Sequence, residues 1–363
     1  MAKKSFQASS IFKQLRKSGK EVDLLLLYNE SDCVQDPSFA YVSGAQGVFE
    51  GSGAYAWPSG KVVIATNSLE KESAELTGFE VFVPDKKAYL QKVMDSDEAV
   101  KRVGLNFGNV SAAFLERVRN KYPSLEFVDA SPEIEAARSI KSEEEINKIR
   151  DAARISGKAF EELLDEDFSK LDESKACAQL NYEMALRGSP KQAFDSIVAF
   201  GASASQPHYT PGKIKPRKGD CLLFDFGAKK DLYCADISRT VFYGKANPIL
   251  KEAYQVVLES QQAAFDALKP GVEWKEVHEA GARVIDSSKF KGKFIHGVGH
   301  SLGLEVHDPG ITGKTILEKG MVLTVEPGIY LPRVGGIRIE DDVVVTGKGF
   351  KLLTRTGKDL LEL

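Results

Sequence analysis

The chain has 363 residues, of which 42% are hydrophobic and 28% charged, and its formal net charge is −3. This length leaves room for two domains, and the near-neutral charge gives no reason to expect nucleic acid or a membrane as a partner. The four cysteines are scattered without a C-x-x-C pair, and the N-terminal sequence MAKKSFQASS has no apolar signal core. These features predict a cytoplasmic protein without a disulfide framework.

Residues 1–130 are predicted to form a small α/β domain. Helical spacing is found at 6–16, 86–94 and 111–121. Short apolar runs typical of strands lie at 23–28, 39–42, 61–66, 81–83, 103–106 and 126–129. Because strands alternate with helices, we expect a mostly parallel sheet. The stretch from Gly44 to Gly60 is rich in glycine and lacks phosphate-loop spacing, so we interpret it as a mobile loop or an interface.

Residues 131–363 are predicted to form a second domain, entered through a link at 131–141. A helix is expected after Ser142, because Glu145 three residues later completes a capping box. Further helices are predicted at 174–187, 247–268 and 273–288. The chain from 142 to 345 therefore reads helix, helix, hairpin twice, with extended sequence before each hairpin. This order predicts a pseudo-symmetric pair of sheets wrapped by helices, with a site on the internal axis.

The first hairpin covers residues 221–241 and carries two aspartates in apolar strand sequence. A turn centred between Lys230 and Asp231 would place Asp225 directly opposite Asp236. Two like charges that face each other destabilise an antiparallel pair, and their burial costs far more unless a cation lies between them. The alternative is that each acid points outward into solvent.

The second hairpin, residues 323–345, repeats this arrangement with two glutamates. A loop centred on Arg333 would bring Glu326 opposite Glu340. Two hairpins that each carry a facing carboxylate pair favour a site for two divalent cations over four solvent-exposed acids.

Three of the five histidines lie within twelve residues, at His296, His300 and His307. The glycines around them allow close backbone approach. On a strand, His296 and His300 would share one face and His307 would take the other, so we expect different roles for them. His208 lies in a turn-rich segment just before the first hairpin, and its sequence context fits a site residue and an ordinary loop residue equally well.

The combined candidate ligand set contains four carboxylates and at least one imidazole. Oxygen-rich ligation with one nitrogen suits Mn²⁺, Co²⁺ or Fe²⁺, with Zn²⁺ as an alternative. Two divalent cations would balance the four negative charges, and they can lower the pKa of a shared water from ~16 towards neutrality. A neighbouring histidine can then stabilise a developing oxyanion.

These motifs resemble those of the pita-bread metallopeptidases, specifically the branch that contains Xaa-Pro dipeptidase (prolidase) and Xaa-Pro aminopeptidase (aminopeptidase P). The motifs are D-x-G with a second aspartate eleven residues on, G-H-x-x-G-L ending in His-Asp, E-P-G-x-Y and G-x-R-I-E-D. The resemblance covers most of the chain. It implies a creatinase-like α/β domain at 1–130, an α+β pita-bread catalytic domain with pseudo-two-fold symmetry at 131–363, and a homodimer.

The resemblance also implies roles for individual residues. Five matched positions inherit the role of metal ligand: Asp225, Asp236, His300, Glu326 and Glu340. His208 and His296 would contact substrate, and His307 would stabilise the tetrahedral intermediate. Glu326 would double as a proton shuttle, and Arg338 would brace the site near the last ligand. Because all five ligands are present, the metal-free relatives of this fold are poor matches.

The implied reaction is hydrolysis of the peptide bond before proline in a small peptide, with two divalent cations, in the first place Mn²⁺ or Co²⁺. Three departures from the family pattern stand out. The segment ADISRT at 235–240 stands where the family often has S-D-x-T-R-T. Ser301 follows the metal histidine where the family often has glycine, and the segment HDPGITGK lacks the arginine that holds the free carboxylate in dipeptidases. Xaa-Pro dipeptidase is the first expectation. Aminopeptidase P activity on longer peptides, a non-peptidase metalloenzyme and a non-catalytic binding protein remain the alternatives.

Overall fold

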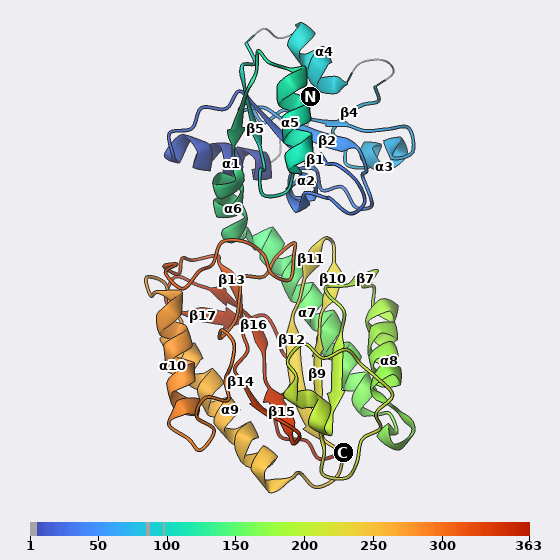
Figure 1. Ribbon diagram of the computed structural model, residues 1–363, viewed down its shortest axis with the longest axis vertical. Helices are drawn as coiled ribbons and strands as arrows, with labels where there is room; N and C mark the ends of the chain where they lie inside the picture. The colour runs from blue at the N-terminus through green and yellow to red at the C-terminus, as the bar shows by residue number, and fades with distance from the viewer. Residues whose placement is uncertain (1–5, 85–87, 97–98) are drawn as a thin grey trace. The chain divides into compact units, whose positions relative to one another are not determined.

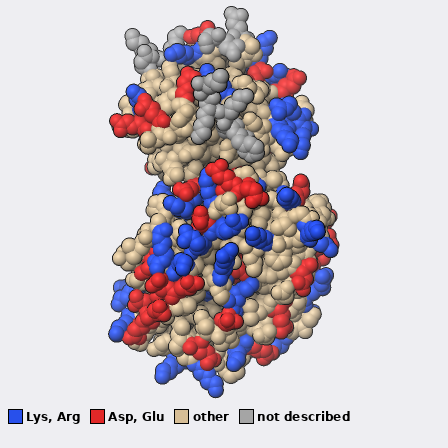
Figure 2. Space-filling model, turned by 180° about the vertical axis from the view of Figure 1, so that it is seen from behind, with Lys and Arg blue, Asp and Glu red and all other residues tan. Residues whose placement is uncertain are grey.

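The computed structural model describes residues 6–84, 88–96 and 99–363. The chain divides into two compact units, Met1–Arg138 and Ser139–Leu363, each of which is described by itself (Figure 1). None of the helices in the described ranges combines the length and the apolar character that a membrane crossing needs. Basic and acidic side chains are interspersed on the face shown in Figure 2, in keeping with the net charge of −3.

The first unit is built on a six-stranded sheet with the order β4-β3-β2-β1-β5-β6. Its strands are β1 (Leu24–Asn29), β2 (Ser52–Ala56), β3 (Val62–Ala65), β4 (Glu80–Phe82), β5 (Arg102–Leu105) and β6 (Glu126–Asp129). Its helices are α1 (Phe6–Lys17), α2 (Pro37–Ser43), α3 (Lys71–Glu75), α4 (Tyr89–Ser96) and α5 (Ala112–Lys121), and α6 (Ser131–Ser139) follows. Strand β2 is antiparallel to both of its neighbours, whereas the other pairs are parallel. The prediction of a mostly parallel sheet is confirmed.

Two predictions for this unit are wrong. Residues 39–42, predicted as a strand, lie in helix α2, whose N-cap Asp36 accepts a hydrogen bond from the Ser38 N–H and whose first residue is Pro37. This N-terminal signal outweighs the aromatic and β-branched composition of the segment. The stretch 44–60 is not one continuous loop, because residues 52–56 within it form β2, which is buried along its whole length in the middle of the sheet. Part of the helix predicted at 86–94 falls on residues outside the described ranges, and α4 begins at Tyr89.

The second unit contains the predicted repeat of helix, helix and hairpin. Its helices are α7 (Glu143–Leu164), α8 (Glu173–Leu186), α9 (Pro248–Ala267) and α10 (Trp274–Asp286), with short 3₁₀ helices η1 (Phe168–Lys170) and η2 (Gly201–Ser205). The strands of the first half are β7 (Lys191–Gln192), β8 (Ile197–Phe200), β9 (Cys221–Phe226), β10 (Ala228–Lys230), β11 (Tyr233–Cys234) and β12 (Ile237–Phe242). Those of the second half are β13 (Val322–Val325), β14 (Gly328–Leu331), β15 (Gly335–Arg338), β16 (Asp341–Val345) and β17 (Phe350–Leu352). In Figure 1 the two β regions lie in the middle of the unit, with α7 and α8 beside the first and α9 and α10 beside the second.

The helices of this unit begin where the sequence signals predict. Ser142 and Glu145 form the predicted capping box of α7, and Asn247 caps α9 by accepting from the Ile249 N–H. Gly188, which follows α8, has a φ of 91°, a left-handed conformation that favours glycine. Local capping chemistry therefore sets the frame on which the two hairpins are held.

The register of the first hairpin differs from the prediction. Asp225 lies opposite Ser238 and not opposite Asp236. The two-residue turn consists of Asp231 and Leu232, which both have positive φ values, 47° and 78°. This geometry is typical of a type I′ hairpin turn. It is centred one position later than predicted, and Asp236 therefore lies diagonally across from Asp225.

The register of the second hairpin is confirmed. Strand β13 pairs with β16 and β14 pairs with β15 in one continuous register, which places Glu326 opposite Glu340. The loop is centred on Arg333, whose φ is 65°. The strand predicted before this hairpin is not found in the described chain, where residues 290–321 have no regular strand and make only isolated bridges such as that from Ser301 to Leu323.

Candidate metal centre

A cavity of about 680 Å³ in the second unit is lined by residues of both hairpins and of the histidine segment. All nine predicted site residues line it: His208, Asp225, Asp236, His296, His300, His307, Glu326, Arg338 and Glu340. His208 is an exposed member of this group, and Arg338 and Glu340 are buried. Residues that lie more than 130 positions apart in the sequence therefore meet in one place.

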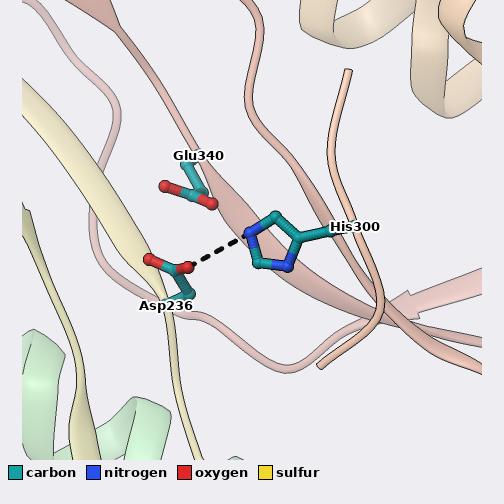
Figure 3. Close-up of side chains that lie close together, drawn as sticks. All are labelled: Asp236, His300 and Glu340. Atoms are coloured by element: carbon teal, nitrogen blue, oxygen red, sulfur yellow. Dashed lines mark ion pairs between the residues drawn. The ribbon is translucent and has the colours of Figure 1, made fainter. Parts of the chain in front are cut away.

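Three of these side chains form the tightest cluster. Asp236, His300 and Glu340 each offer one ligand atom, and the three atoms lie within 4.8 Å of one another (Figure 3). His300 Nε2 lies 3.4 Å from Asp236 Oδ2 and 3.5 Å from Glu326 Oε1. His300 Nδ1 lies 3.0 Å from the Ser301 carbonyl oxygen and donates to it. This hydrogen bond leaves the lone pair of Nε2 free and aimed at the carboxylates, which is the arrangement of a metal-binding histidine.

The carboxylates of the cluster are buried close to one another. Burial and then the neighbouring carboxylates raise the pKa of Asp236 and of Glu340 well above the ordinary values. Burial, followed by the charge of Asp225, raises the pKa of Glu326 to about 7, although Arg338 acts in the opposite direction. One oxygen each of Asp225, Asp236 and Glu340 is buried and has no hydrogen-bond partner among the described residues. A buried carboxylate oxygen without a hydrogen-bond partner lowers the stability of the fold. A bound divalent cation would supply the missing partner.

The histidine segment is not a strand, and its predicted division into two faces is wrong. The rings of His300 and His307 lie in contact, with centroids 4.1 Å apart. Gly299 lets the backbone approach the second hairpin, because a Cβ at this position would lie 2.1 Å from the Thr324 carbonyl oxygen. Burial lowers the pKa of His300 to about 4, so its imidazole is neutral and able to bind a cation.

One guanidinium connects the two hairpins. Arg338 donates from Nη2 to Asp225 Oδ2 at 2.6 Å, from Nε to Ser238 Oγ at 2.8 Å and from Nη1 to Tyr330 OH at 2.8 Å. Ser238 Oγ in turn donates to Glu340 Oε2 at 2.7 Å. Arg338 therefore sets the orientation of carboxylates in both halves of the unit.

Sequence reasoning missed two of these partners, Ser238 and Tyr330. The Tyr330 hydroxyl accepts from Arg338 and donates to His296 Nε2 at 2.8 Å, while His296 Nδ1 donates to the Gly297 carbonyl at 2.8 Å. Burial, and then the charge of Arg338, lowers the pKa of His296 to about 4. Both missed residues lie inside the motifs ADISRT and EPGIY, so the signal was present in the sequence.

The loop that carries His307 is held by a buried ion pair. Lys141 Nζ lies 3.1 Å from Asp308 Oδ2, and the two side chains are 1% and 2% exposed. The Asp308 N–H also donates to the Ser301 carbonyl at 3.0 Å. The residues that follow His300 and His307 are therefore joined directly, which keeps the two imidazoles together.

A buried cluster of carboxylates and a neutral imidazole, held by two related β hairpins, defines a hydrolytic metalloenzyme of the pita-bread fold. Residues 147–347 match the model of metallopeptidase family M24, and residues 11–140 match that of the creatinase/prolidase N-terminal domain. The chain belongs to metallopeptidase family M24, and it is a peptidase whose family implies divalent metal ions.

The relatives are similar to this chain over most of its length. The Xaa-Pro dipeptidase of Pyrococcus horikoshii is 34% identical over 331 residues, which cover 90% of this chain and 93% of the relative. The Xaa-Pro dipeptidase of Pyrococcus furiosus is 38% identical over 257 residues, 70% and 74% of the two chains. Among solved structures, the X-Pro aminopeptidase from Thermotoga maritima has a TM-score of 0.89 and 31% identity, with 97% and 100% of the chains covered. The prolidase from Pyrococcus horikoshii has a TM-score of 0.86 and 32% identity, with 98% and 99% covered. The predicted fold is confirmed.

Proposed function

We propose that this protein hydrolyses the peptide bond that precedes proline, in the first place as an Xaa-Pro dipeptidase. The observation that carries the proposal is the convergence of Asp236, His300 and Glu340 within 4.8 Å, beside Asp225 and Glu326. The Xaa-Pro dipeptidases among its relatives support the choice of substrate.

The proposed cofactor is a pair of divalent cations, Mn²⁺ or Co²⁺ first, with Fe²⁺ and Zn²⁺ as alternatives. Asp225, Asp236, His300, Glu326 and Glu340 would hold them, because their buried oxygens and the free His300 nitrogen form a donor set of this kind. Such cations activate water and polarise the substrate carbonyl.

The chain's own groups have separate tasks in this proposal. Glu326 takes the proton from the attacking water and delivers it to the proline nitrogen, which needs a proton in order to leave. His307 donates a hydrogen bond to the oxygen of the scissile carbonyl as negative charge develops there. His208 and His296 contact the substrate, and Arg338 keeps Asp225 and Ser238 in place.

Part of the cavity wall suits a proline ring. Phe194, Ile197 and Ile295 line the cavity together with the site residues, and the Ile295 side chain is 63% exposed although it is apolar. We propose that an apolar ring of the substrate covers these side chains. The proline nitrogen carries no N–H, so recognition of the ring by contact replaces the hydrogen bond that other peptides offer.

Aminopeptidase P activity is the second candidate. The Thermotoga maritima structure supports it, and so does the segment HDPGITGK, which has no arginine to hold the carboxylate of a dipeptide. We also propose a homodimer, which the mass in solution from light scattering would test. A cytoplasmic location is supported by four free cysteines, which suit a reducing compartment.

The deciding experiment measures product release from Leu-Pro, from Leu-Pro-Ala and from the proline-free control Leu-Ala. The protein is first treated with chelator and then supplied with Mn²⁺, Co²⁺, Fe²⁺ or Zn²⁺. We expect release of proline from Leu-Pro only after metal is added. Faster cleavage of Leu-Pro-Ala would favour the aminopeptidase, and no cleavage of either proline peptide with any of the four metals would overturn the proposal.

A further inference from the structure

The ladder of the second hairpin is interrupted beside the two glutamates, at Pro327 and Ile339. The Glu326 N–H donates to the Val298 carbonyl at 2.7 Å, and the Glu340 N–H donates to the Ser238 carbonyl at 3.1 Å. Both bonds leave the hairpin for other segments, as expected for a non-hydrogen-bonded pair of an antiparallel ladder. The β13–β16 ladder ends on one side of this position and the β14–β15 ladder starts on the other. Between the two ladders the Ile339 N–H donates to the Pro327 carbonyl at 3.5 Å, but Pro327 has no N–H to donate back to the Ile339 carbonyl. The Ile339 carbonyl therefore needs another donor.

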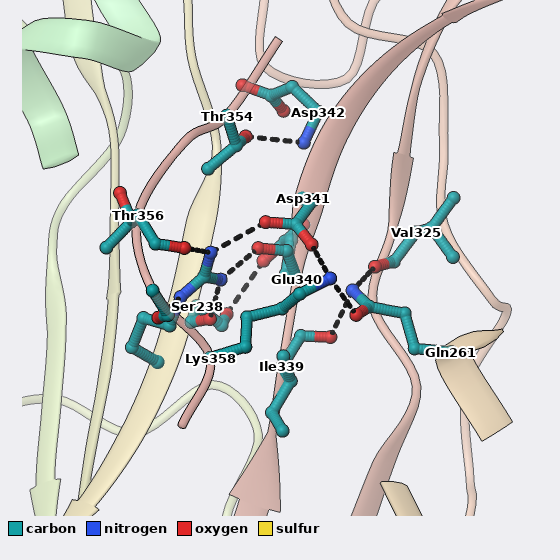
Figure 4. Close-up of polar contacts among 12 residues, drawn as sticks. Ser238, Gln261, Val325, Ile339, Glu340, Asp341, Asp342, Thr354, Thr356 and Lys358 are labelled. Carbon is teal, nitrogen blue, oxygen red and sulfur yellow. Dashed lines mark hydrogen bonds and ion pairs between the residues drawn. The ribbon is translucent and has the colours of Figure 1, made fainter. Parts of the chain in front are cut away.

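A glutamine side chain from helix α9 bridges the two strands at this interruption (Figure 4). Gln261 Nε2 donates to the Val325 carbonyl at 3.0 Å and to the Ile339 carbonyl at 3.2 Å. These two residues directly precede Glu326 and Glu340. A carboxamide nitrogen carries two N–H groups, one for each strand. The Gln261 side chain is 1% exposed, so water does not compete for these bonds.

A lysine fixes the orientation of this amide. Lys358 Nζ donates to Gln261 Oε1 at 2.9 Å and to Asp341 Oδ2 at 2.7 Å. A flipped amide would turn its NH₂ group towards the ammonium and its oxygen towards the two carbonyls, which is unfavourable at every contact. On the other side of Asp341, Arg239 Nη2 donates to Oδ1 at 2.6 Å, and its Nη1 donates to the Glu340 carbonyl at 2.5 Å.

We propose that Gln261, oriented by Lys358, is a positioning residue that holds Glu326 and Glu340 opposite each other at the metal centre. It lines no part of the cavity and touches neither substrate nor reacting atoms. It acts through the two backbone carbonyls that precede the glutamates. This inference rests on the proposed metal-dependent function, and it adds a residue that no motif of the sequence analysis pointed to.

The test compares two glutamines that are adjacent in α9. Gln261→Met keeps the length of the side chain but removes its three hydrogen bonds, whereas Gln262→Met changes an exposed residue whose amide donates to Asp266. Mn²⁺ binding to the chelator-treated protein is measured by titration calorimetry, and kcat and KM are measured on Leu-Pro. We expect Gln261→Met to weaken Mn²⁺ binding by about 10- to 100-fold, the range for loss of a partner that orients metal ligands. It should lower kcat with little change in KM, and Gln262→Met should match the native protein.

The outcomes separate the two proposals. If the native protein binds no metal, the proposed function fails. If the native protein binds Mn²⁺ and a folded Gln261→Met variant binds it equally well, the positioning role is overturned. Should Gln261→Met not fold, Lys358→Met serves in its place, because this lysine is 28% exposed and lies near the chain end. We expect Lys358→Met to weaken Mn²⁺ binding as well. Unchanged binding in a folded variant would overturn the positioning role of Gln261.

Discussion

The two hairpins of the catalytic unit have the same place in the element order but different registers. In the second hairpin, Glu326 and Glu340 lie directly opposite each other, beside the interruption of the ladder at Pro327. In the first hairpin, Asp225 lies opposite Ser238, and Asp236 lies diagonally across from Asp225. A repeated order of helices and strands therefore does not repeat the geometry of the ligands.

The local backbone explains the difference. The register of the first hairpin, continued by one position, places Gly227 opposite Asp236. A Cβ on Gly227 would lie 1.8 Å from the Ala235 carbonyl oxygen, so no side chain can face Asp236 there. Asp225 is instead braced by Arg338, which belongs to the other hairpin. Each half therefore braces an acid of the other, because Arg338 donates to Asp225 and Ser238 donates to Glu340.

The largest effect is expected at Glu326, an acid of the second half whose role no group of the first half can take over. Glu326→Gln should lower kcat by about 10²- to 10⁴-fold, because an amide neither takes nor delivers the proton. The measurement is kcat on Leu-Pro at saturating Mn²⁺, with metal content determined on the same sample. Glu318→Gln, an exposed acid in the preceding turn, is the control. A Glu326→Gln variant with native kcat would remove the proton shuttle from the mechanism.

The next largest effect is expected when Arg338, which connects the two hairpins, is replaced. Arg338→Lys should weaken Mn²⁺ binding and lower kcat by about 10- to 100-fold, because one ammonium cannot reproduce three donors in a fixed plane. Titration calorimetry and steady-state rates measure the two quantities. Arg333→Lys, in the exposed loop of the same hairpin, should leave both unchanged. If Arg338→Lys and Arg333→Lys gave the same Mn²⁺ affinity and kcat, Asp225 would not need its hydrogen bond from Arg338.

A smaller effect concerns the competition between protons and metal ions for the buried carboxylates. The raised acid pKa values of Asp236, Glu340 and Glu326, the last about 7, mean that the metal-free folded protein holds more protons than the unfolded chain. The contribution of these three groups to the free energy of unfolding is therefore greatest at low pH, and it falls as the pH rises through their pKa values in the folded protein. Divalent cations bind the ionised carboxylates. The increase in Tm on adding Mn²⁺ should grow from pH 5 to pH 8, and a constant increase would contradict this expectation.

The smallest effect concerns the turn that sets the first register. Leu232 has a φ of 78°, which costs a non-glycine residue about 1 kcal/mol. Leu232→Gly should raise the free energy of unfolding by up to about 1 kcal/mol, since Asp-Gly suits a type I′ turn. Urea denaturation measures the change, and Leu232→Ala, which keeps a Cβ, should give no such gain. A loss of stability in the glycine variant would show that the leucine side chain matters more than its backbone strain.

Those parts of the molecule that depend on local signals could be predicted from the sequence. Capping residues such as Ser142 and Asn247 mark helix ends by their own hydrogen bonds, so the order of elements followed. The four candidate carboxylates stand out because charged groups are conspicuous in apolar strand sequence, and His296, His300 and His307 stand out because they are clustered. Arg338 and the site role of His208 were expected only from the resemblance to the family. The register around Arg333 followed because the loop is symmetric about it.

The remainder depends on tertiary contacts that no local pattern reveals. Strand β2 is rich in small residues and lies in a glycine-rich stretch, yet sheet neighbours on both sides bury it. The turn at Asp231 and Leu232 uses left-handed conformations that its residue types do not favour, so the turn was placed one position too early. Gln261 and Lys358 are ordinary residues in their own segments, and their role depends on strands more than sixty residues away from the glutamine.

The Lys141–Asp308 pair has a consequence for anyone who wishes to separate the catalytic unit from the rest of the chain. The region that matches the peptidase family begins at residue 147, but Ile140 bridges Met321 and the Lys141 N–H donates to the Gly320 carbonyl at 2.9 Å. A fragment cut at the family boundary would remove the Lys141 partner of Asp308, a buried carboxylate next to His307 in the chain. Truncations that start at or before Ser139 retain the lysine, and with it the shape of the histidine loop.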